Sequence, residues 1–481
     1  MNLYDRNLAM LDKDVLSLCN LEGTYTAGEL RNSVLRYESM LGPLNLEGKR
    51  IALIVPVLKE YIPLFLAANK LKATVAPLSY QLRREDLSDI LEFLDPHIVF
   101  TVNEFSGFTF PEVITKWALG RETETLVFTS DNCTKWEVET FPGCSKNLQS
   151  DSGGFICFTS GSTGAPKGMV FKDDVMDYVY NRVLEAMNLE STDNVFVYAS
   201  PSTQYGVASM NSILKAGATL VVADEFDLLN MINTMQKAKC NKVTTTPSIF
   251  KSLYNFASRL NPEVLNRLEL VCVIGEKIPT NFRSHFPLLK NCTFVSHYGS
   301  SESGSLANAY INEDTEELIF RMADPVEFKT VEGELFVKTA GLFTEYYKNP
   351  ILTQGAFEKG WFMMGDLVEF LDEKNFKIVG RKKDVIKKGG QQVISGEVEQ
   401  ILSNIVGVKS VAVVGAPHDV YGEQIVAYII AEGLTSKDIR TYCTGKYASY
   451  KIPDQIIFTD EFPLTNGKVD KIKLKSRLGR G

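Results

Sequence analysis

The sequence predicts an α/β fold: a large N-terminal domain of sandwiched, mostly parallel sheets, followed by a small, mobile α+β domain at the C-terminus. Two observations carry this prediction. Short β-rich apolar runs alternate with stretches of helical spacing through the first two thirds of the chain, which is typical of parallel sheets covered by helices. From about Val331 the strand-like runs follow one another closely, which indicates antiparallel structure.

The predicted parallel strands are short apolar runs bounded by turn residues. They are IALIV from Ile51, HIVFTV from His97, TLVFTS from Thr125, FICFTS from Phe155, NVFVYAS from Asn194, TLVVAD from Thr219, KVTTTP from Lys242 and LVCVIG from Leu270. Runs without polar alternation suit strands buried on both faces.

Later elements predict two further sections. The runs GELFVKT, FMMGDLVEFL and FKIVGRKK predict a small antiparallel or barrel-like section within residues 331–382. Beyond it we expect a helix near Gly396–Ile405, strands at VAVVGA and IVAYIIA, and a helix near Lys437–Tyr447. The charged, turn-rich segment GRKKDVIKKGG is the expected joint, so the predicted domains are residues 1–382 and 383–481.

Composition excludes several classes of protein. The chain has 481 residues, 44% hydrophobic and 23% charged, which excludes disordered and collagen-like chains. A net charge of -8 lacks the basic excess of a nucleic-acid binder. The apolar runs fall short of the roughly 20 residues that a bilayer crossing needs, so no transmembrane segment is expected. The cysteines show no C-x-x-C spacing and acidic residues interrupt the N-terminal segment, so we expect a cytoplasmic protein with reduced thiols.

A glycine-rich loop follows the run FICF. It contains Thr159, Ser160, Gly161, Ser162, Thr163 and Gly164, then Ala165, Pro166, Lys167 and Gly168. Small residues let backbone N–H groups surround phosphate oxygens, and hydroxyls and a lysine add donors and charge. The register does not match a Walker A loop, since Pro166 stands where that motif needs glycine. A surface turn is the alternative.

The chain resembles the adenylate-forming superfamily of acyl- and aryl-CoA ligases, luciferases and peptide-synthetase adenylation domains. Besides the loop, the resemblance rests on Tyr298-Gly299-Ser300-Ser301-Glu302, Gly333-Glu334-Leu335, Gly360-Trp361-Phe362, Gly365-Asp366-Leu367, Gly380-Arg381 through Gly390 and Glu397, Tyr450-Lys451-Ile452-Pro453, and Pro463-Leu464-Thr465-Asn466-Gly467-Lys468. These motifs stand in the family's order and span nearly the whole chain. The resemblance implies that ATP activates a carboxylic acid as acyl-AMP, with release of pyrophosphate, before the acyl group passes to a thiol.

The resemblance also implies roles for individual residues. Lys468 matches the lysine that bridges the acid and the α-phosphate, and Glu302 matches the acidic residue that helps to hold Mg²⁺. A solvated tail lysine and a surface glutamate are the alternatives. The other residues matched to ATP or AMP contacts, besides the loop, are Gly275, Glu276, Tyr298, Gly299, Ser300, Ser301, Asp366 and Arg381, with Tyr298 stacking on adenine and Asp366 accepting the ribose hydroxyls.

Domain alternation is implied as well. Lys383 matches the family's hinge, and rotation there would exchange Lys468 for the face that carries Lys387, Gly389 and Gly390, which would form a channel for the thiol.

The acyl pocket departs from the family pattern. Gln204 stands where peptide synthetases carry aspartate and where acyl-CoA ligases commonly carry histidine. A buried ammonium would lack a counter-charge there, which disfavours α-amino acids. The expected pocket residues are Gln204, Tyr205, Phe250, Ile274 and His297, and they favour a neutral aryl or medium acyl group.

The sequence therefore predicts an AMP-forming acid–thiol ligase that uses ATP, Mg²⁺ and a small carboxylic acid. Its acceptor is expected to be CoA. The alternative acceptor is the phosphopantetheine arm of a carrier protein, which the basic C-terminal segment could meet if that carrier is acidic. A catalytically silent homologue and a luciferase-type monooxygenase are the remaining alternatives. No nucleic acid partner is expected.

Overall fold

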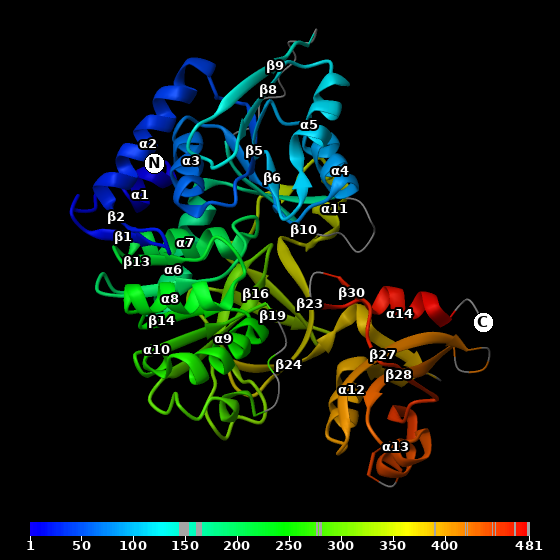
Figure 1. The fold of residues 1–481 in the computed structure, drawn as a ribbon. Helices are drawn as coiled ribbons and strands as arrows, with labels where there is room; N and C mark the ends of the chain where they lie inside the picture. The colour runs from blue at the N-terminus through cyan, green and yellow to red at the C-terminus, as the bar shows by residue number, and fades with distance from the viewer. Residues whose placement is uncertain are drawn as a thin grey trace. The chain divides into compact units, whose positions relative to one another are not determined.

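The structure is a computed structural model, and it describes residues 1–143, 153–159, 166–275, 278, 281–388, 391–418, 420, 422–444, 446–447, 449–465 and 468–478. The chain divides into two compact units (Figure 1). The larger unit holds Met1–Pro325 and Thr339–Ala356, and the smaller holds Val326–Lys338 and Phe357–Gly481. The strands of the 331–382 section thus group with the C-terminal residues. The predicted pivot at Lys383 stays a prediction.

The first sheet of the larger unit contains the glycine-rich loop's two strands. Its order is β21 (Glu345–Tyr346), β11 (Lys167–Phe171), β10 (Gly154–Thr159), β4 (Thr74–Pro77), β3 (Arg50–Ile54), β5 (Ile98–Val102), β8 (Thr125–Ser130) and β9 (Glu137–Phe141). The central pairs from β10 to β8 are parallel, and the pairs at both ends are antiparallel. All residues of β3, β4 and β5 are buried, as apolar runs without alternation predict.

The second sheet of the larger unit is also mostly parallel. Its order in this unit is β18 (Phe320–Met322), β17 (Gly304–Tyr310), β16 (Thr293–Ser300), β15 (Leu270–Val273), β14 (Lys242–Thr245), β12 (Asn194–Val197), β13 (Thr219–Val222), β1 (Leu16–Cys19) and β2 (Thr24–Thr26). Strands β16 to β1 run parallel, whereas β17, β18 and β2 join antiparallel. Each run predicted as a parallel strand lies in one of these two sheets, so that prediction is confirmed.

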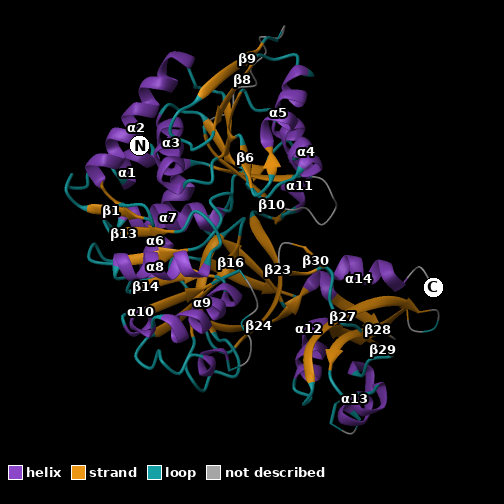
Figure 2. Cartoon of the chain, viewed as in Figure 1, coloured by secondary structure: helices purple, strands orange, loops and turns teal. Residues whose placement is uncertain are grey.

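Helices lie between and outside the sheets (Figure 2). Between them α2 (Ala27–Leu41) packs on α3 (Leu58–Lys70), and α6 (Asp173–Ala186) packs on α7 (Gln204–Lys215), while α1 (Leu3–Asn7) contacts α3, α6 and α7. Nearly every residue of α3 and α7 is buried, as a central helix layer requires. The outer helices are α4 (Arg84–Leu94), α5 (Phe110–Leu119), α8 (Leu228–Ala238), α9 (Pro247–Leu260) and α10 (Pro262–Asn266).

The short elements of the larger unit complete it. They are the 3-10 turns Gly42–Leu44 and Phe282–His285, the hairpin β6 (Glu104–Phe105) with β7 (Phe108–Thr109), and α11 (Pro350–Gly355). The part of this unit that carries α8, α9 and α10 has its own apolar core, in which Phe250, Phe286 and Phe294 are almost fully buried.

The smaller unit begins with an antiparallel meander. It consists of β19 (Glu327–Val331), β20 (Glu334–Lys338), β23 (Trp361–Phe370) and β24 (Asn375–Arg381), with β22 (Phe357–Glu358) also paired to β23. The antiparallel prediction is confirmed. The strand order is linear, so we describe the section as a meander and not as a barrel.

The rest of the smaller unit is the predicted α+β structure. Its sheet contains β25 (Val385–Lys388), β26 (Gln391–Ile394), β27 (Val408–His418), β28 (Gly422–Ala431) and β29 (Gln455–Phe458), with α12 (Ser395–Ser403), α13 (Ser436–Cys443), α14 (Lys471–Leu478) and the 3-10 turns Lys382–Asp384 and Ser449–Lys451. A hairpin of β30 (Leu464–Thr465) and β31 (Lys468–Val469) precedes α14. The predicted helices and strands are present, and the helix predicted to reach Tyr447 ends at Cys443.

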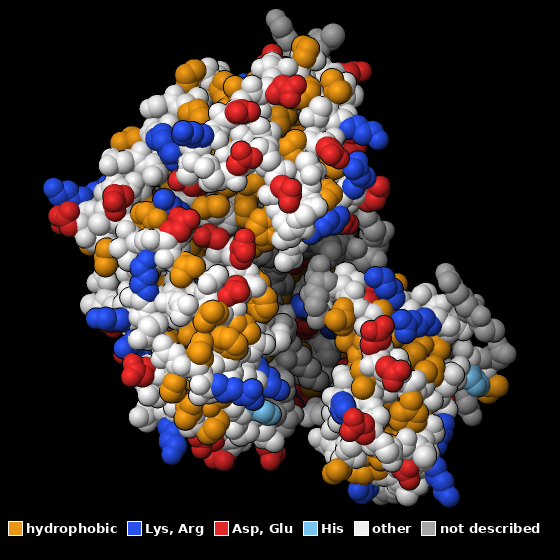
Figure 3. Space-filling view, viewed as in Figure 1, with side chains coloured by type: hydrophobic (Ala, Val, Ile, Leu, Met, Phe, Trp, Pro, Cys, Tyr) orange, Lys and Arg blue, Asp and Glu red, His pale blue; other side chains and the backbone are white. Residues whose placement is uncertain are grey.

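The surface carries charges of both signs. On the face shown in Figure 3, basic and acidic side chains are interspersed over each unit. Among the described residues, no helix is long and apolar enough to cross a membrane.

Candidate active site

The glycine-rich loop joins two antiparallel strands of the first sheet. Thr159 ends β10 and lies opposite Lys167, which begins β11, so the hairpin register closes the loop at these two residues. Ser160, Gly161, Ser162, Thr163 and Gly164 lie outside the described residues, as do Glu276, Gly389 and Gly390. Lys167, at the end of the loop, is a residue whose side-chain contacts the structure describes.

Lys167, Glu302 and Tyr346 form one cluster of hydrogen-bonding side chains. The Lys167 ammonium lies 3.1 Å from Glu302 Oε1, and the Tyr346 hydroxyl donates to the same oxygen at 2.9 Å. Lys167 also lies 4.1 Å from the centroid of the Tyr346 ring. The sheet register explains the contact between Lys167 and Tyr346, because β21 pairs with β11 and brings Tyr346 beside the strand that Lys167 begins. The sequence motifs identified Lys167 and Glu302, whereas Tyr346 was missed because its strand has only two residues.

The electrostatics of this cluster keep Glu302 ionised. Burial by itself raises the pKa of the carboxyl, but the charge of Lys167 and hydrogen bonds from Lys167 and Tyr346 outweigh burial, and the pKa of Glu302 lies below its ordinary value. Burial and the neighbouring carboxylate raise the pKa of Tyr346, so its hydroxyl stays protonated and continues to donate. The side chains of Lys167 and Glu302 keep 29% and 17% of their surface exposed, so a ligand can reach them.

The donor set fits a magnesium–phosphate group. Mg²⁺ is commonly held by one or two carboxylates together with substrate phosphates and water, so an ionised, partly exposed carboxylate is sufficient protein ligation. Glu302 supplies that carboxylate, and the adjacent Lys167 supplies a positive charge for phosphate oxygens. Among the described residues no group of three or more His, Cys, Asp or Glu side chains is placed to hold a metal by itself.

Glu302 sits in the turn of a tight hairpin between β16 and β17. Tyr298, Gly299 and Ser300 end β16, Ser301 follows in the turn, and Tyr298 is buried against Phe320 with ring centroids 5.6 Å apart. Gly299 is required because a Cβ there would lie 1.8 Å from the carbonyl oxygen of Gly304. This close approach of the two strands fixes the turn that presents Glu302.

Three of the predicted acyl-pocket residues lie together. Gln204 and Tyr205 begin α7, and the Tyr205 ring packs edge-on against His297 of β16, with centroids 6.2 Å apart. A hydrogen bond of 2.6 Å joins the Tyr205 hydroxyl to Thr244 Oγ1 on β14. Ile274 and Gly275 follow β15, and Gly275 has a φ of 89°.

Phe250 is placed elsewhere. Only 1% of it is exposed, and its ring packs edge-on against Phe286 and Phe294 at centroid distances of 5.1 and 5.7 Å. Its helix α9 is amphipathic and turns Phe250, Leu253 and Ala257 into this core. The expectation that Phe250 lines the acyl pocket is therefore corrected: it is a core residue.

The smaller unit brings together a second pair of predicted residues. Asp366 on β23 and Arg381 on β24 are cross-strand partners, and Arg381 Nε lies 2.6 Å from Asp366 Oδ1. The Asp366 side chain is 4% exposed and that of Arg381 is 50% exposed. Beside them Lys382 Nζ lies 2.6 Å from Glu334 Oε2.

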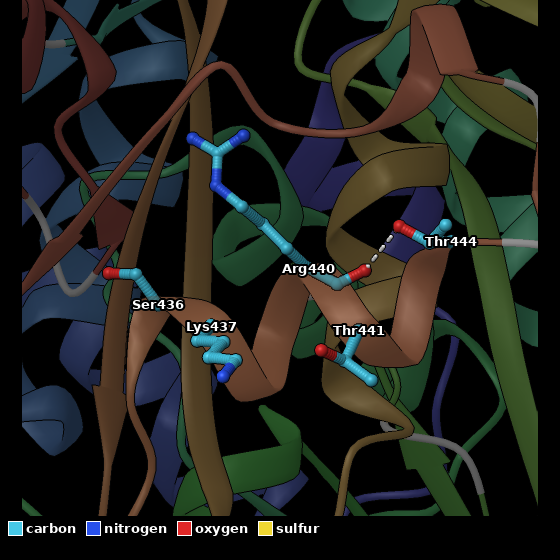
Figure 4. A pocket seen from close by; sticks show the side chains of 5 residues that line it. All are labelled: Ser436, Lys437, Arg440, Thr441 and Thr444. Atoms are coloured by element: carbon cyan, nitrogen blue, oxygen red, sulfur yellow. Dashed lines mark hydrogen bonds between the residues drawn. The ribbon is translucent and has the colours of Figure 1, made fainter.

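The predicted catalytic and hinge lysines of the smaller unit are all exposed. Lys468 begins β31 opposite Thr465, Lys383 lies in the turn before β25, and Lys387 lies on β25. The backbone N–H of Lys387 donates to Glu423 Oε2 at 2.6 Å, and Lys387 is an exposed residue. A shallow hollow elsewhere in this unit follows α13 (Figure 4), lined by Ser436, Lys437, Arg440, Thr441 and Thr444.

Comparisons with known proteins agree with these features. Residues 9–347 match the AMP-binding enzyme family, and residues 397–468 match the AMP-binding enzyme C-terminal domain. A long-chain-fatty-acid–CoA ligase of Mycobacterium tuberculosis is 26% identical over 461 residues, covering 90% of this chain and 88% of the relative. A 2-succinylbenzoate–CoA ligase of Listeria monocytogenes is 24% identical over 467 residues, covering 94% of this chain and 91% of the relative.

Solved structures share the fold. ATP-bound MatB from Rhodopseudomonas palustris superposes with a TM-score of 0.85 at 21% identity, covering 100% of this chain and 99% of that one. The resemblance to adenylate-forming enzymes that the motifs indicated is thus confirmed. The chain belongs to the AMP-binding enzyme family and is an enzyme of its AMP-forming ligase type.

Proposed function

We propose that this enzyme activates a small carboxylic acid with ATP, forms an acyl-adenylate with release of pyrophosphate, and transfers the acyl group to the thiol of CoA. The observation that carries the proposal is the cluster of Lys167, Glu302 and Tyr346. It places an ionised carboxylate and a lysine ammonium within 3.1 Å of each other beside the glycine-rich loop. Such a pair suits a metal-bound polyphosphate, which needs an oxygen ligand for the metal and a cation for the phosphates.

Each residue of this cluster has a defined task. Bound Mg²⁺ supplies charge neutralisation at the phosphate oxygens. Glu302 would hold the metal, Tyr346 donates to the Glu302 carboxylate and so orients it, and Lys167 would bind phosphate oxygens. Asp366 accepts hydrogen bonds from the ribose hydroxyls, and Arg381 orients Asp366 from the neighbouring strand.

Lys468 is proposed to stabilise the charge that develops at the α-phosphate and the attacking carboxylate. An exposed ammonium on a short hairpin can enter and leave a site without unfolding its unit. We propose that Lys383 is the hinge for this exchange and that Lys387, with Gly389 and Gly390, faces the thiol in the second step. Free cysteines in the described part of the chain agree with a reducing, cytoplasmic setting.

The test is ATP–pyrophosphate exchange over a panel of aryl, fatty and amino acids. We expect exchange with one class of acid and a loss of about 10²–10³-fold in Lys468→Ala, the size of effect seen when one preorganised charge-stabilising group is removed. Lys409→Ala is the matched control, because Lys409 is an exposed lysine of the same unit that pairs with the exposed Glu432.

The acceptor is then identified by thioester formation. Incubation of acid and ATP with CoA should yield the acyl-CoA product, and a phosphopantetheinylated carrier protein should not replace CoA. Exchange that persists in Lys468→Ala contradicts the role of this lysine, and exchange with no acid contradicts the proposed function.

A further inference from the structure

A cluster of buried polar side chains lies in the larger unit where the first residues of α7 approach β16 and β17. Gln204 is 3% exposed and His297 is 5% exposed. His297 and Asn308 are cross-strand partners, so their side chains share one face of the sheet. Gln204 lies over the start of β17, since a Cβ added to Gly304 would meet Gln204 Nε2 at 3.5 Å. The Tyr205 ring connects the two sides by its contact with His297.

Four polar atoms of this cluster are unsatisfied in the part of the chain that the structure describes. Both ring nitrogens of His297, Nε2 of Gln204 and Oδ1 of Asn308 are buried without a hydrogen-bond partner among the described residues. Buried polar atoms in native proteins are nearly always paired, and each unpaired atom is costly. Several such atoms on residues that these contacts connect indicate that a ligand completes them.

The cluster also specifies what that ligand must offer. The Gln204 amide can only donate at Nε2, the Asn308 amide can only accept at Oδ1, and a neutral imidazole does one of each. Burial alone lowers the pKa of His297 to about 4, so the ring is neutral at physiological pH and no charged side chain contributes to its shift. A carboxylate only accepts and an ammonium only donates, and either would be buried without a counter-charge. A hydroxyl both donates and accepts and carries no charge.

We propose that the acid activated by this enzyme carries a neutral hydroxyl group, held by Gln204, His297 and Asn308. This inference rests on the proposed function, since it names the class of acid that enters the same site. Plain fatty or aryl acids, dicarboxylic acids and amino acids would leave the polar atoms unpaired or bury an unpaired charge. A site built to bind a substrate hydroxyl discriminates strongly against the analogue that lacks it.

Matched acids test the proposal in pyrophosphate exchange. The panel holds benzoate with its ortho-, meta- and para-hydroxy derivatives, hexanoate with its β- and ω-hydroxy derivatives, and the dicarboxylic and amino acids of the same lengths. We expect one hydroxylated acid to exceed its parent in kcat/KM by about a hundredfold or more. Parent acids that equal or exceed all their hydroxylated derivatives overturn the inference while leaving the proposed function intact. Absence of exchange with every acid overturns the proposed function, and this inference with it.

Variants then test whether these side chains cause the preference for hydroxylated acids. His297→Leu and Gln204→Leu should each lower the ratio of hydroxylated to parent acid by about tenfold or more, whereas His297→Gln, which keeps a donor and an acceptor, should retain much of the ratio. Thr234→Val is the control, because it removes a buried hydroxyl of α8 that donates to the carbonyl of Asn230 in the same helix. Melting temperatures establish that each variant is folded, and Gln204→Leu serves if His297→Leu is not. A ratio that stays constant in the folded leucine variants means that water pairs these atoms, and it refutes the inference.

Discussion

Replacing Tyr346 by phenylalanine removes one hydroxyl from the candidate active site and leaves the ring in place. The hydroxyl donates to Glu302 at 2.9 Å, and Lys167 lies over the face of the same ring. Phenylalanine keeps this cation–π contact, so the variant isolates the hydrogen bond to the carboxylate. Glu302 is mostly buried, with 17% of its side chain exposed, so water replaces the lost donor only in part.

The size of the effect follows from the charge on the acceptor. A hydrogen bond to an ionised group contributes about 1.5–3 kcal/mol, so the free energy of unfolding at neutral pH should fall by about that amount. The native pKa of Glu302 is depressed, and the stability it contributes is present above its ordinary pKa of 4.5 and is lost as the pH falls through the native value. Loss of the donor raises the native pKa, so the ionised form, which we propose binds magnesium, is lost at a higher pH.

Two measurements check this prediction. Chemical denaturation at neutral pH gives the loss of stability, and the pH profile of pyrophosphate exchange should have an acid limb displaced to higher pH. Tyr347→Phe is the matched control, because the neighbouring hydroxyl donates to the carbonyl of Leu94 at 3.3 Å. An acid limb that is the same in wild type and in folded Tyr346→Phe would refute the reasoning.

Three further substitutions separate the hairpin, the core and a buried ion pair. Gly299→Ala forces a Cβ into the facing strand, so it should lower the free energy of unfolding by about 1–3 kcal/mol or more and weaken pyrophosphate exchange. Gly355→Ala is the control, because a Cβ there meets open space and should change neither quantity. Equal effects in both variants would contradict the packing argument. Phe250→Ala should cost about 3–5 kcal/mol in the free energy of unfolding without altering the order of preferred acids, and a changed order at wild-type stability would return Phe250 to the acyl pocket. Lys242→Met leaves the buried Asp193 carboxylate, now 2.8 Å from Lys242 Nζ, without its cation, and should cost about 3–5 kcal/mol by chemical denaturation; a neutral result would show that solvent reaches the pair.

Much of the fold was predictable because local composition decides it. Strands β3, β4 and β5 are buried on both faces, and only continuous apolar runs such as Ile51 to Ile54 satisfy that environment. Segment boundaries were less predictable. The helix expected to reach Tyr447 ends at Cys443, where Thr444-Gly445 in the sequence is a stop signal that the prediction did not use. The compact units also do not divide at Lys383, because strand pairing, not chain order, groups the meander with the C-terminal residues.

The motifs of the sequence by themselves determined the family, and they predict the glycine-rich loop, Glu302, Asp366 and Lys468 as site residues, since each stands in a characteristic run of neighbours. Only the tertiary structure decided which residues distant in the sequence contact one another. Tyr346 reaches Glu302 across 44 residues of chain through the pairing of β21 with β11, and no local pattern encodes a strand of two residues. The same holds for Gln204 and His297, which have buried polar atoms without a partner among the described residues. Hydrogen-bond satisfaction is a property of three-dimensional neighbours, and for that reason it could not be predicted from residue order.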